Sequence, residues 1–180
     1  MDKTETIEID ENWGRDPFLR SLLRELMGTL ERVVGLSDSE GFVSAVGQCI
    51  GDRMNRAYRT RLGRSKLDRR EVTETLVDLK RRIDGDFYVA EESTERIVLR
   101  NRRCPFGEFV KDRRSLCMMT SNVFGTIAAE NLGYARVTLA ETIAGGHEGC
   151  HVIIHLTEAS EETESDDREY FSLAEPRDDA

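Results

Sequence analysis

The sequence contains no apolar stretch near the roughly eighteen residues that a membrane-spanning helix needs, so it predicts no membrane span. Residues 1–6 are acidic and have neither the basic nor the apolar segment of an export signal. No internal repeat is visible. The glycines at 145 and 146 join two expected strands, which is typical of a hairpin turn and not of a phosphate-binding loop. These absences predict a cytoplasmic protein.

Acidic residues are concentrated at the two ends of the chain. The 180 residues carry a net charge of -9, yet residues 1–16 hold six acids against two bases and residues 157–180 hold ten against two. The segment between them is therefore mildly basic. We expect an acidic, flexible N-terminus at 1–16, a single folded domain at 17–156 and an acidic, disordered tail at 157–180.

The first half of the chain has the hydrophobic periodicity of helices. Apolar residues recur at helical spacing over 18–34, after an Asp-Pro start. A capping-box pattern begins a second helix over 37–63, and another begins a third over 68–85. Gly47 and Gly51 in the second helix would allow close backbone approach. The sequence therefore predicts three N-terminal amphipathic helices.

The period changes to that of strands after the third helix. Residues 86–100 have the pattern of a β-hairpin, and a fourth helix capped by Ser115 is expected up to residue 133. Two further strands are expected at 134–143 and 150–156. This order predicts the α+β class, with three N-terminal helices followed by a β-hairpin, a helix and a second β-hairpin. The strands would form an antiparallel sheet backed by the helices.

Three of the four cysteines lie at the ends of predicted elements. Cys104, Cys117 and Cys150 are far apart in sequence and form no local Cys-x-x-Cys pair, so only the fold could bring them together. Thiolates are soft ligands that suit zinc, copper(I) and iron–sulfur clusters, and His147 is the nearest candidate for a fourth ligand. The alternative is that the thiols pack as small apolar groups, which is also what we expect of Cys49.

The same segments carry a resemblance to a known family. The chain resembles the methanogen output domain, and through it the 4-vinyl-reductase-type sensory domains and the cysteine-rich sensor half of iron–sulfur repressors. The resemblance covers most of residues 17–156. It rests on Cys104-Pro-Phe-Gly, Leu116-Cys-Met-Met, Phe124-Gly, Gly133-Tyr and Glu141-Thr-Ile-Ala-Gly-Gly-His-Glu-Gly-Cys150-His-Val-Ile-Ile.

The resemblance implies a regulatory domain that senses a small molecule, a metal or redox state through a cysteine-held cofactor. Two departures limit it. The zinc-containing relatives of the vinyl-reductase type carry a further cysteine in the area where this chain has Ile143. The repressor relatives have a DNA-binding domain in front of the sensor half. In this chain only a segment of about sixteen residues, acidic in composition, precedes the first expected helix. Signalling would then depend on a protein partner or on a homodimer.

Three functions follow from these patterns. The leading hypothesis is a sensor, acting in signal transduction or transcription regulation, in which Cys104, Cys117 and Cys150 hold an iron–sulfur cluster or zinc, with His147 as a further ligand. The second is a tetrapyrrole-type reductase or hydrolase, which only the resemblance suggests, so the sequence favours a protein that is not an enzyme. The third is a scaffold without metal, in which the cysteines belong to the core.

A run of basic residues ends the second helix and could meet phosphate or an acidic partner. Tyr58 is the only aromatic residue within it, so base stacking has little support and the sequence argues against direct binding of nucleic acid. A solvated helix face, or a landing site for the acidic tail, explains the run better. Its members are Arg53, Arg56, Arg59, Arg61, Arg64, Lys66, Arg69 and Arg70.

Overall fold

A computed structural model describes residues 14–158 and 167–172. The elements follow the order expected from the sequence, and the α+β class is confirmed. The helices are α1 (Arg15–Val34), α2 (Leu36–Leu62), α3 (Arg69–Arg81) and α4 (Arg114–Leu132), with short 3-10 turns η1 (Gly107–Val110) and η2 (Ile143–Gly145). The strands are β1 (Asp86–Glu92), β2 (Arg96–Arg103), β3 (Tyr134–Glu141), β4 (His151–His155) and β5 (Arg168–Phe171).

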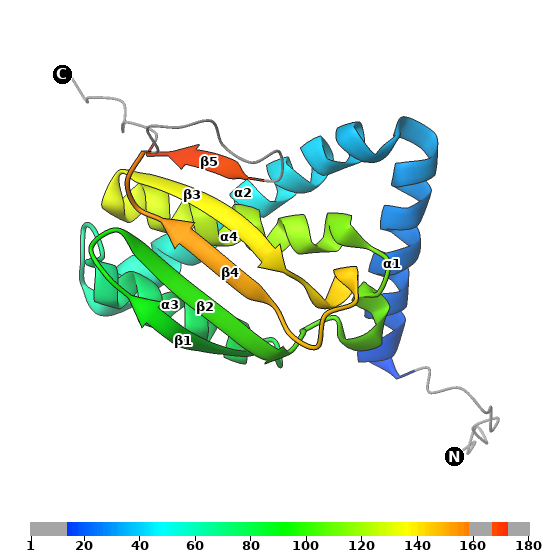
Figure 1. Ribbon diagram of the computed structural model, residues 1–180, viewed down its shortest axis with the longest axis horizontal. Coiled ribbons are helices and arrows are strands. Elements are labelled where there is room, and N and C mark those ends of the chain that lie inside the picture. Colours follow the sequence, from blue (N-terminus) through cyan, green and yellow to red (C-terminus); the bar gives the residue numbers. More distant parts are fainter. Residues whose placement is uncertain (1–13, 159–166, 173–180) are drawn as a thin grey trace, which may run out of the picture.

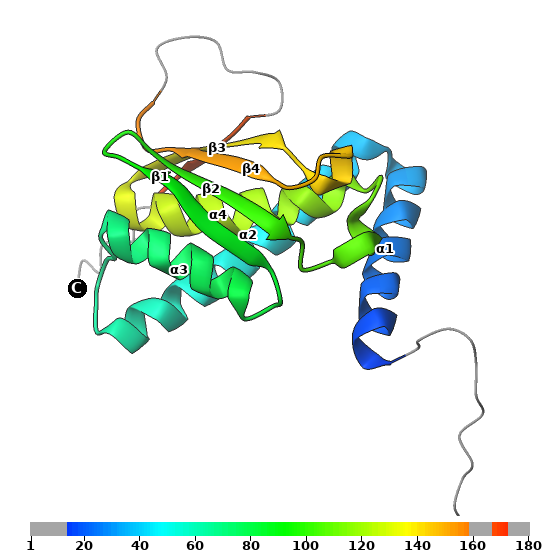
Figure 2. The same ribbon diagram turned by 60° about the horizontal axis from the view of Figure 1, so that its bottom comes forward.

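The strands form one antiparallel sheet in the order β1-β2-β4-β3-β5. Helices α2, α3 and α4 cover one face of this sheet (Figure 2). Along β4, Val152 and Ile154 are buried while the residues between and beside them are only partly covered. This alternation is the one expected of a sheet with a single packed face.

Helix α4 lies at the centre of the helical layer, between the sheet and α2. Phe124 and Ile127 of α4 are fully buried in the main core cluster. Helix α2 approaches α4 closely because Gly47 and Gly51 have no side chains: a Cβ atom at Gly51 would lie 2.9 Å from the Cβ of Thr126. The expected close approach at these two glycines is confirmed.

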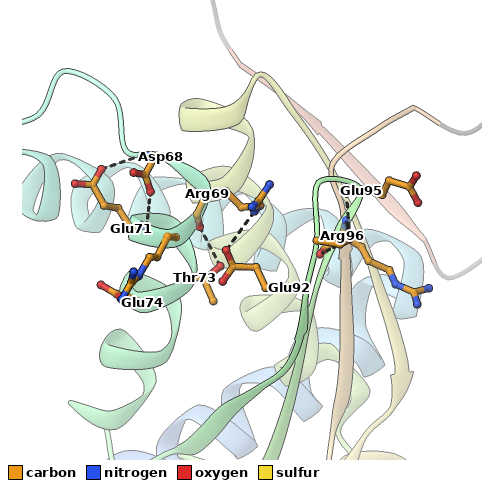
Figure 3. Close-up of polar contacts among 10 residues, drawn as sticks. Asp68, Arg69, Glu71, Thr73, Glu74, Glu92, Glu95 and Arg96 are labelled. Atoms are coloured by element: carbon orange, nitrogen blue, oxygen red, sulfur yellow. Dashed lines mark hydrogen bonds and ion pairs between the residues drawn. The ribbon is translucent and has the colours of Figure 1, made fainter.

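Helix α3 is held at its first turn by the capping box that the sequence indicates. The Asp68 carboxylate accepts a hydrogen bond of 2.8 Å from the Glu71 amide, and the Glu71 carboxylate accepts one of 3.0 Å from the Asp68 amide (Figure 3). Arg69 then forms an ion pair of 3.2 Å with Glu92 at the end of β1. These contacts set the position of α3 against the hairpin.

Two of the expectations about helices and strands are wrong. The tail was expected to be disordered from residue 157, but residues 168–171 form β5 beside β3 (Figure 1), because Tyr170 packs against Gly125 and hydrogen-bonds with Ser121 (3.0 Å). The remaining tail residues, like 1–13, lie outside the described residues. Ser115 does not cap α4, which begins at Arg114, and its hydroxyl donates instead to Glu31 of α1.

Helix α1 stands at one end of the molecule, away from β1 and β2 (Figures 1 and 2). Within the described residues no helix combines the length and the apolarity that crossing a membrane requires.

The contact between Tyr170 and Gly125 generates a test of β5. A Cβ atom at Gly125 would overlap the Tyr170 ring, so we expect Gly125→Ala to lower the free energy of unfolding by about 1–3 kcal/mol and to expose the β5 amides. Urea denaturation and hydrogen exchange would measure both effects. Gly41→Ala is the matched control, because a Cβ atom there meets nothing within 4 Å. Equal stability and equal protection of β5 in the two variants would contradict the packing described.

Candidate functional site

The fold brings the three separated cysteines to one small cavity. Cys104 follows β2, Cys117 lies in the first turn of α4, and Cys150 immediately precedes β4. The cavity has a volume of about 20 Å³ and lies where the two hydrophobic clusters meet. Its walls are Phe87, Asn101, Cys104, Pro105, Phe106, Val110, Leu116, Cys117, Thr120, Leu139, Thr142, Cys150 and Val152.

Each of the three sulfur atoms is approached by hydrogen-bond donors. In the Cys-Pro-Phe-Gly turn, burial raises the pKa of the Cys104 thiol while the amide groups of residues 106 and 107 act to lower it, and the Gly107 amide also donates a hydrogen bond of 2.9 Å to the Cys104 carbonyl oxygen. The Thr142 hydroxyl points at the Cys117 sulfur, and the amide of residue 143 points at that of Cys150. Donors aimed at sulfur favour the thiolate over the thiol. These donors offset part of the cost of a thiolate at each sulfur, although burial leaves the pKa of all three thiols raised.

Asn101 adds a further donor beside Cys150. Its side chain is 5% exposed, and its Oδ1 accepts a hydrogen bond of 2.7 Å from the Cys150 amide. Its Nδ2 is buried and has no hydrogen bond of good geometry within the described residues, although it faces the Cys150 sulfur closely enough to favour the thiolate. Buried polar groups almost always have partners. This amide is therefore oriented toward an acceptor at the cavity.

Lys80, in the last turn of α3, extends its ammonium group toward the same sulfurs. The residue is 5% exposed, and its Nζ donates a hydrogen bond of 2.7 Å to the Thr120 hydroxyl. The rings of Phe87 and Phe124 lie 5.3 and 5.1 Å from Nζ. In the part of the chain that the structure describes, Lys80 forms no ion pair with a carboxylate. A buried lysine without such a partner is uncommon.

Burial controls the ionisation of these groups. Removal from water lowers the pKa of Lys80 to about 8, and the neighbouring cysteines act in the opposite direction. Burial raises the pKa of Cys117 to about 12, with the charges of the other two sulfurs as a further cause. It also raises the pKa of Cys104 and of Cys150. At neutral pH the site therefore holds an ammonium group and three protonated thiols.

The remaining candidates lie outside this cavity. His147 lines a surface cleft of about 470 Å³ that it shares with Cys104, and its Nδ1 lies 3.2 Å from the Thr142 carbonyl oxygen. Cys49 is exposed on α2, so the expectation that it belongs to the core is wrong. As placed in residues 14–158 and 167–172, no three side chains of the metal-ligating types are close enough to hold an ion.

Sequence reasoning missed Lys80 and Asn101. Lys80 follows Leu76 by four residues, so it falls on the apolar face of α3. This position in the sequence was the available indication that the lysine is buried. Asn101 lies between two arginines in β2. The sequence of this strand therefore gives no sign that Asn101, unlike its neighbours, is buried. Side-chain burial depends on contacts from distant segments, which periodicity alone does not provide.

The run of basic residues that extends from the end of α2 into the first turn of α3 is partly neutralised by ion pairs. Arg64 pairs with Glu71 at 2.9 Å, and Arg70 pairs with Glu74 at 3.0 Å. The described part of the acidic tail does not contact this run but pairs with β3. The expectation that the basic run is a landing site for the acidic tail is therefore wrong for residues 167–172. The other tail residues lie outside the described residues.

The fold and the cavity define a small α+β domain in which three thiols lie around one internal cavity. The sequence of the chain identifies the family to which this domain belongs. The model of methanogen output domain 1 matches residues 22–155, and the chain belongs to this family. The matched range includes the three cavity cysteines, Lys80 and Asn101. The similarity to 4-vinyl-reductase-type domains and to iron–sulfur repressors stays a prediction.

Two solved structures share the fold at low sequence identity. The phenol-responsive sensory domain of the transcription activator PoxR, determined with phenol, has a TM-score of 0.61 at 14% identity, over 82% of this chain and 77% of that one. A trafficking protein particle complex subunit 3 from Naegleria fowleri, covalently bound to palmitic acid, has a TM-score of 0.54 at 13% identity, over 81% and 99%. No curated protein matches the chain in sequence.

The exposure of the cysteines predicts their order of reaction. At neutral pH we expect iodoacetamide to modify Cys49 first, because the other three thiols are shielded and have raised pKa values. Mass spectrometry would show one rapid modification in the native protein and four in denaturant. A Cys49→Ser variant should lose the rapid phase. Modification of Cys117 as fast as that of Cys49 would contradict the burial described.

The buried ammonium group of Lys80 should destabilise the fold at neutral pH. We expect Lys80→Met to raise the free energy of unfolding at pH 7 by roughly 1–3 kcal/mol, because the cost of burying the charge is removed. Exposed Lys66 offers the control Lys66→Met, which should change this free energy by less than about 0.5 kcal/mol. Urea denaturation would compare the variants, and a loss of stability in Lys80→Met would contradict the prediction.

The pH dependence provides a second measurement of Lys80. Its folded pKa of about 8 lies below its ordinary value of 10.5, so the unfolded state binds more protons above about pH 8 and stability rises with pH there. For Cys117 the folded pKa of about 12 exceeds the ordinary 9.0, so stability falls as pH rises above about 9. We expect the rise near pH 8–9 to be absent in Lys80→Met, whereas the later fall remains.

Proposed function

We propose that the protein is a sensory domain in which Cys104, Cys117 and Cys150 bind a soft metal ion as thiolates. The single observation that carries this proposal is the buried Lys80. An ammonium group without a carboxylate partner is stabilised when the three thiols beside it become thiolates, since opposite charges then share a site of low dielectric constant. Thiols that stayed protonated would leave this cation with the Thr120 hydroxyl and the rings of Phe87 and Phe124, but with no anion, among the described residues.

The donors around the sulfurs support the same proposal. The turn at 104–107, the Thr142 hydroxyl and the Asn101 amide all face sulfur. Partners of this kind orient metal ligands and tune their basicity, and their loss commonly costs about 10–100-fold in metal affinity. The raised thiol pKa values argue against a thiol that senses oxidants directly, because such thiols have low pKa values and are accessible.

The size of the cavity favours a single ion. A volume of about 20 Å³ is enough for one water molecule or one ion. An iron–sulfur cluster, or a ligand such as the phenol of the PoxR structure, would require the cavity to open, because organic ligands occupy sites of roughly 300–1,000 Å³. Zinc is therefore the leading candidate and an iron–sulfur cluster the second. The likeness to PoxR supports a sensory role in general.

Movement of the cavity walls would supply the response. Because the three side chains, as placed in the described residues, are not close enough to share an ion, at least one of the cysteines has to move toward the others on binding, and the turn that holds Cys104 is the segment with a path to the surface. Residues 104–113 are attached to α1 through Arg24, whose guanidinium donates hydrogen bonds of 2.7 and 2.6 Å to the carbonyl oxygens of Phe109 and Lys111. A change at the site would thus reach the surface of α1 and a regulatory protein partner.

His147 is the candidate for a fourth ligand. It lies in the segment between β3 and β4 that also supplies Thr142 and Cys150, and its ring is beside the Thr142 carbonyl oxygen. His147 already lines the surface cleft that Cys104 also borders, and a shift of this segment toward Cys104 would bring the imidazole closer to the Cys104 sulfur. The reductase or hydrolase alternative has less support, because in the hydroxyl–amine pair at the cavity wall, Thr120 and Lys80, the lysine is the hydrogen-bond donor and is an ammonium group at neutral pH.

Metal analysis tests the proposed function. Protein purified without oxygen is expected to bind about one zinc ion per chain, and Cys117→Ser to bind at least roughly tenfold more weakly. Cys49→Ser is the matched control and should bind like the wild type, since Cys49 is exposed on α2. Binding should release protons, because the thiols are protonated beforehand, and calorimetry in buffers of different ionisation enthalpy would measure this release.

The alternatives give distinct outcomes in the same experiment. Strong visible absorption together with iron and sulfide would identify a cluster in place of zinc. Asn101→Ala and Lys80→Met should weaken metal binding while leaving the fold intact. The proposal is refuted if the protein takes up neither zinc nor a cluster under reducing conditions, or if Cys117→Ser and Cys49→Ser bind metal equally well.

A further inference from the structure

Helix α1 turns its apolar side away from the protein. Six large apolar side chains of α1 are between 42% and 75% exposed. We call them the α1 face: Phe18, Leu19, Leu22, Leu23, Leu26 and Val33. An amphipathic helix of a globular protein normally buries its apolar stripe. The exposed stripe on α1 is therefore a surface that the described residues, 14–158 and 167–172, leave uncovered.

The inner side of α1 combines a small apolar contact, from Met27 and Leu30, with polar contacts that fix the orientation of the helix. Arg24 holds the carbonyl oxygens of Phe109 and Lys111, and Glu31 accepts a hydrogen bond from Ser115. Met27 and Gly28 are the buried residues of the helix. Rotating α1 to bury its leucines would break all of these contacts. The outward orientation thus belongs to the folded state.

The exposed apolar area approaches what an interface needs. Helix α2, which follows α1 directly, exposes four more large apolar side chains in its first half. Ten such side chains, each roughly half exposed, exceed the few hundred Å² of apolar patch usual for a monomer and approach the ~800 Å² that one partner contributes to a standard interface. The additional four are Leu36, Phe42, Val46 and Ile50.

We infer that the α1 face pairs with the α1 face of a second copy of this chain, forming a twofold-symmetric dimer. Leu19, Leu22 and Leu26 follow the three- and four-residue spacing by which two helices interlock, and Val33 lies seven residues further on. The charged residues at the border of the face are Arg15, Asp16, Glu25 and Arg32, which sum to zero. Two copies of a chain of net charge -9 can therefore meet there without repulsion, which makes a self-complementary pair the best fit.

The mass of the full chain in solution tests this inference. Sedimentation equilibrium of the wild type at micromolar concentration should give twice the chain mass of 20.5 kDa. A Leu22→Glu, Leu26→Glu double variant should be monomeric, with a dissociation constant raised at least a hundredfold and an unchanged circular dichroism spectrum. Ile83→Glu is the control, since Ile83 is similarly exposed (47%) far from α1 in the sequence, and it should remain dimeric.

Cross-linking keeps the inference testable if the double variant folds poorly. In a Cys49→Ser background, Leu22→Cys should form a disulfide-linked dimer on mild oxidation, whereas Val89→Cys should not. A monomeric wild type, which would leave the α1 face to a helix of another protein, or a double variant that stays dimeric, would overturn the inference. Metal binding by Cys117 is measured separately, so the two proposals can fail independently.

Discussion

The packing of α4 between the sheet and α2 is the constraint on which the other contacts depend. Thirteen of its nineteen residues are buried, so the helix needs partners on nearly every side. The glycines of α2 allow one side to be covered closely, Gly125 admits the Tyr170 ring of β5 on another, and the sheet covers a third. Cys117 and Thr120 stand on this helix, and its burial therefore fixes one wall of the cavity.

The cavity combines groups that oppose stability with groups that suit a charged occupant. Lys80 and Cys117 have pKa values shifted by burial toward their neutral forms, which means that each charged form is costly in the present arrangement. A thiolate–ammonium arrangement removes part of that cost. Sites that lose stability in exchange for binding are common in proteins, and the cost of burying Lys80 fits such a site.

The outward face of α1 shows how far periodicity can be used. The spacing of Phe18, Leu22 and Leu26 predicts an amphipathic helix correctly, but it does not tell which partner covers the apolar side. Similarly, the residues of β5 lie in a segment whose acidic composition is typical of disorder, and the strand is held by contacts with distant segments, among them Tyr170 against Gly125 and Arg168 with Glu40. Both differences arise from contacts between segments far apart in the sequence.

The sequence by itself determined the α+β order of elements, the capping of α3, the close approach at Gly47 and the placement of three cysteines at element ends. These features depend on local backbone preferences and on periodicity, which are encoded within a few residues. Only the tertiary structure decided that the three sulfurs share one cavity, that Asn101 lines it, that the buried Lys80 reaches its wall at Thr120 and that α1 exposes its leucines. The reason is physical: burial and desolvation are set by neighbours from distant segments, and no local pattern contains them.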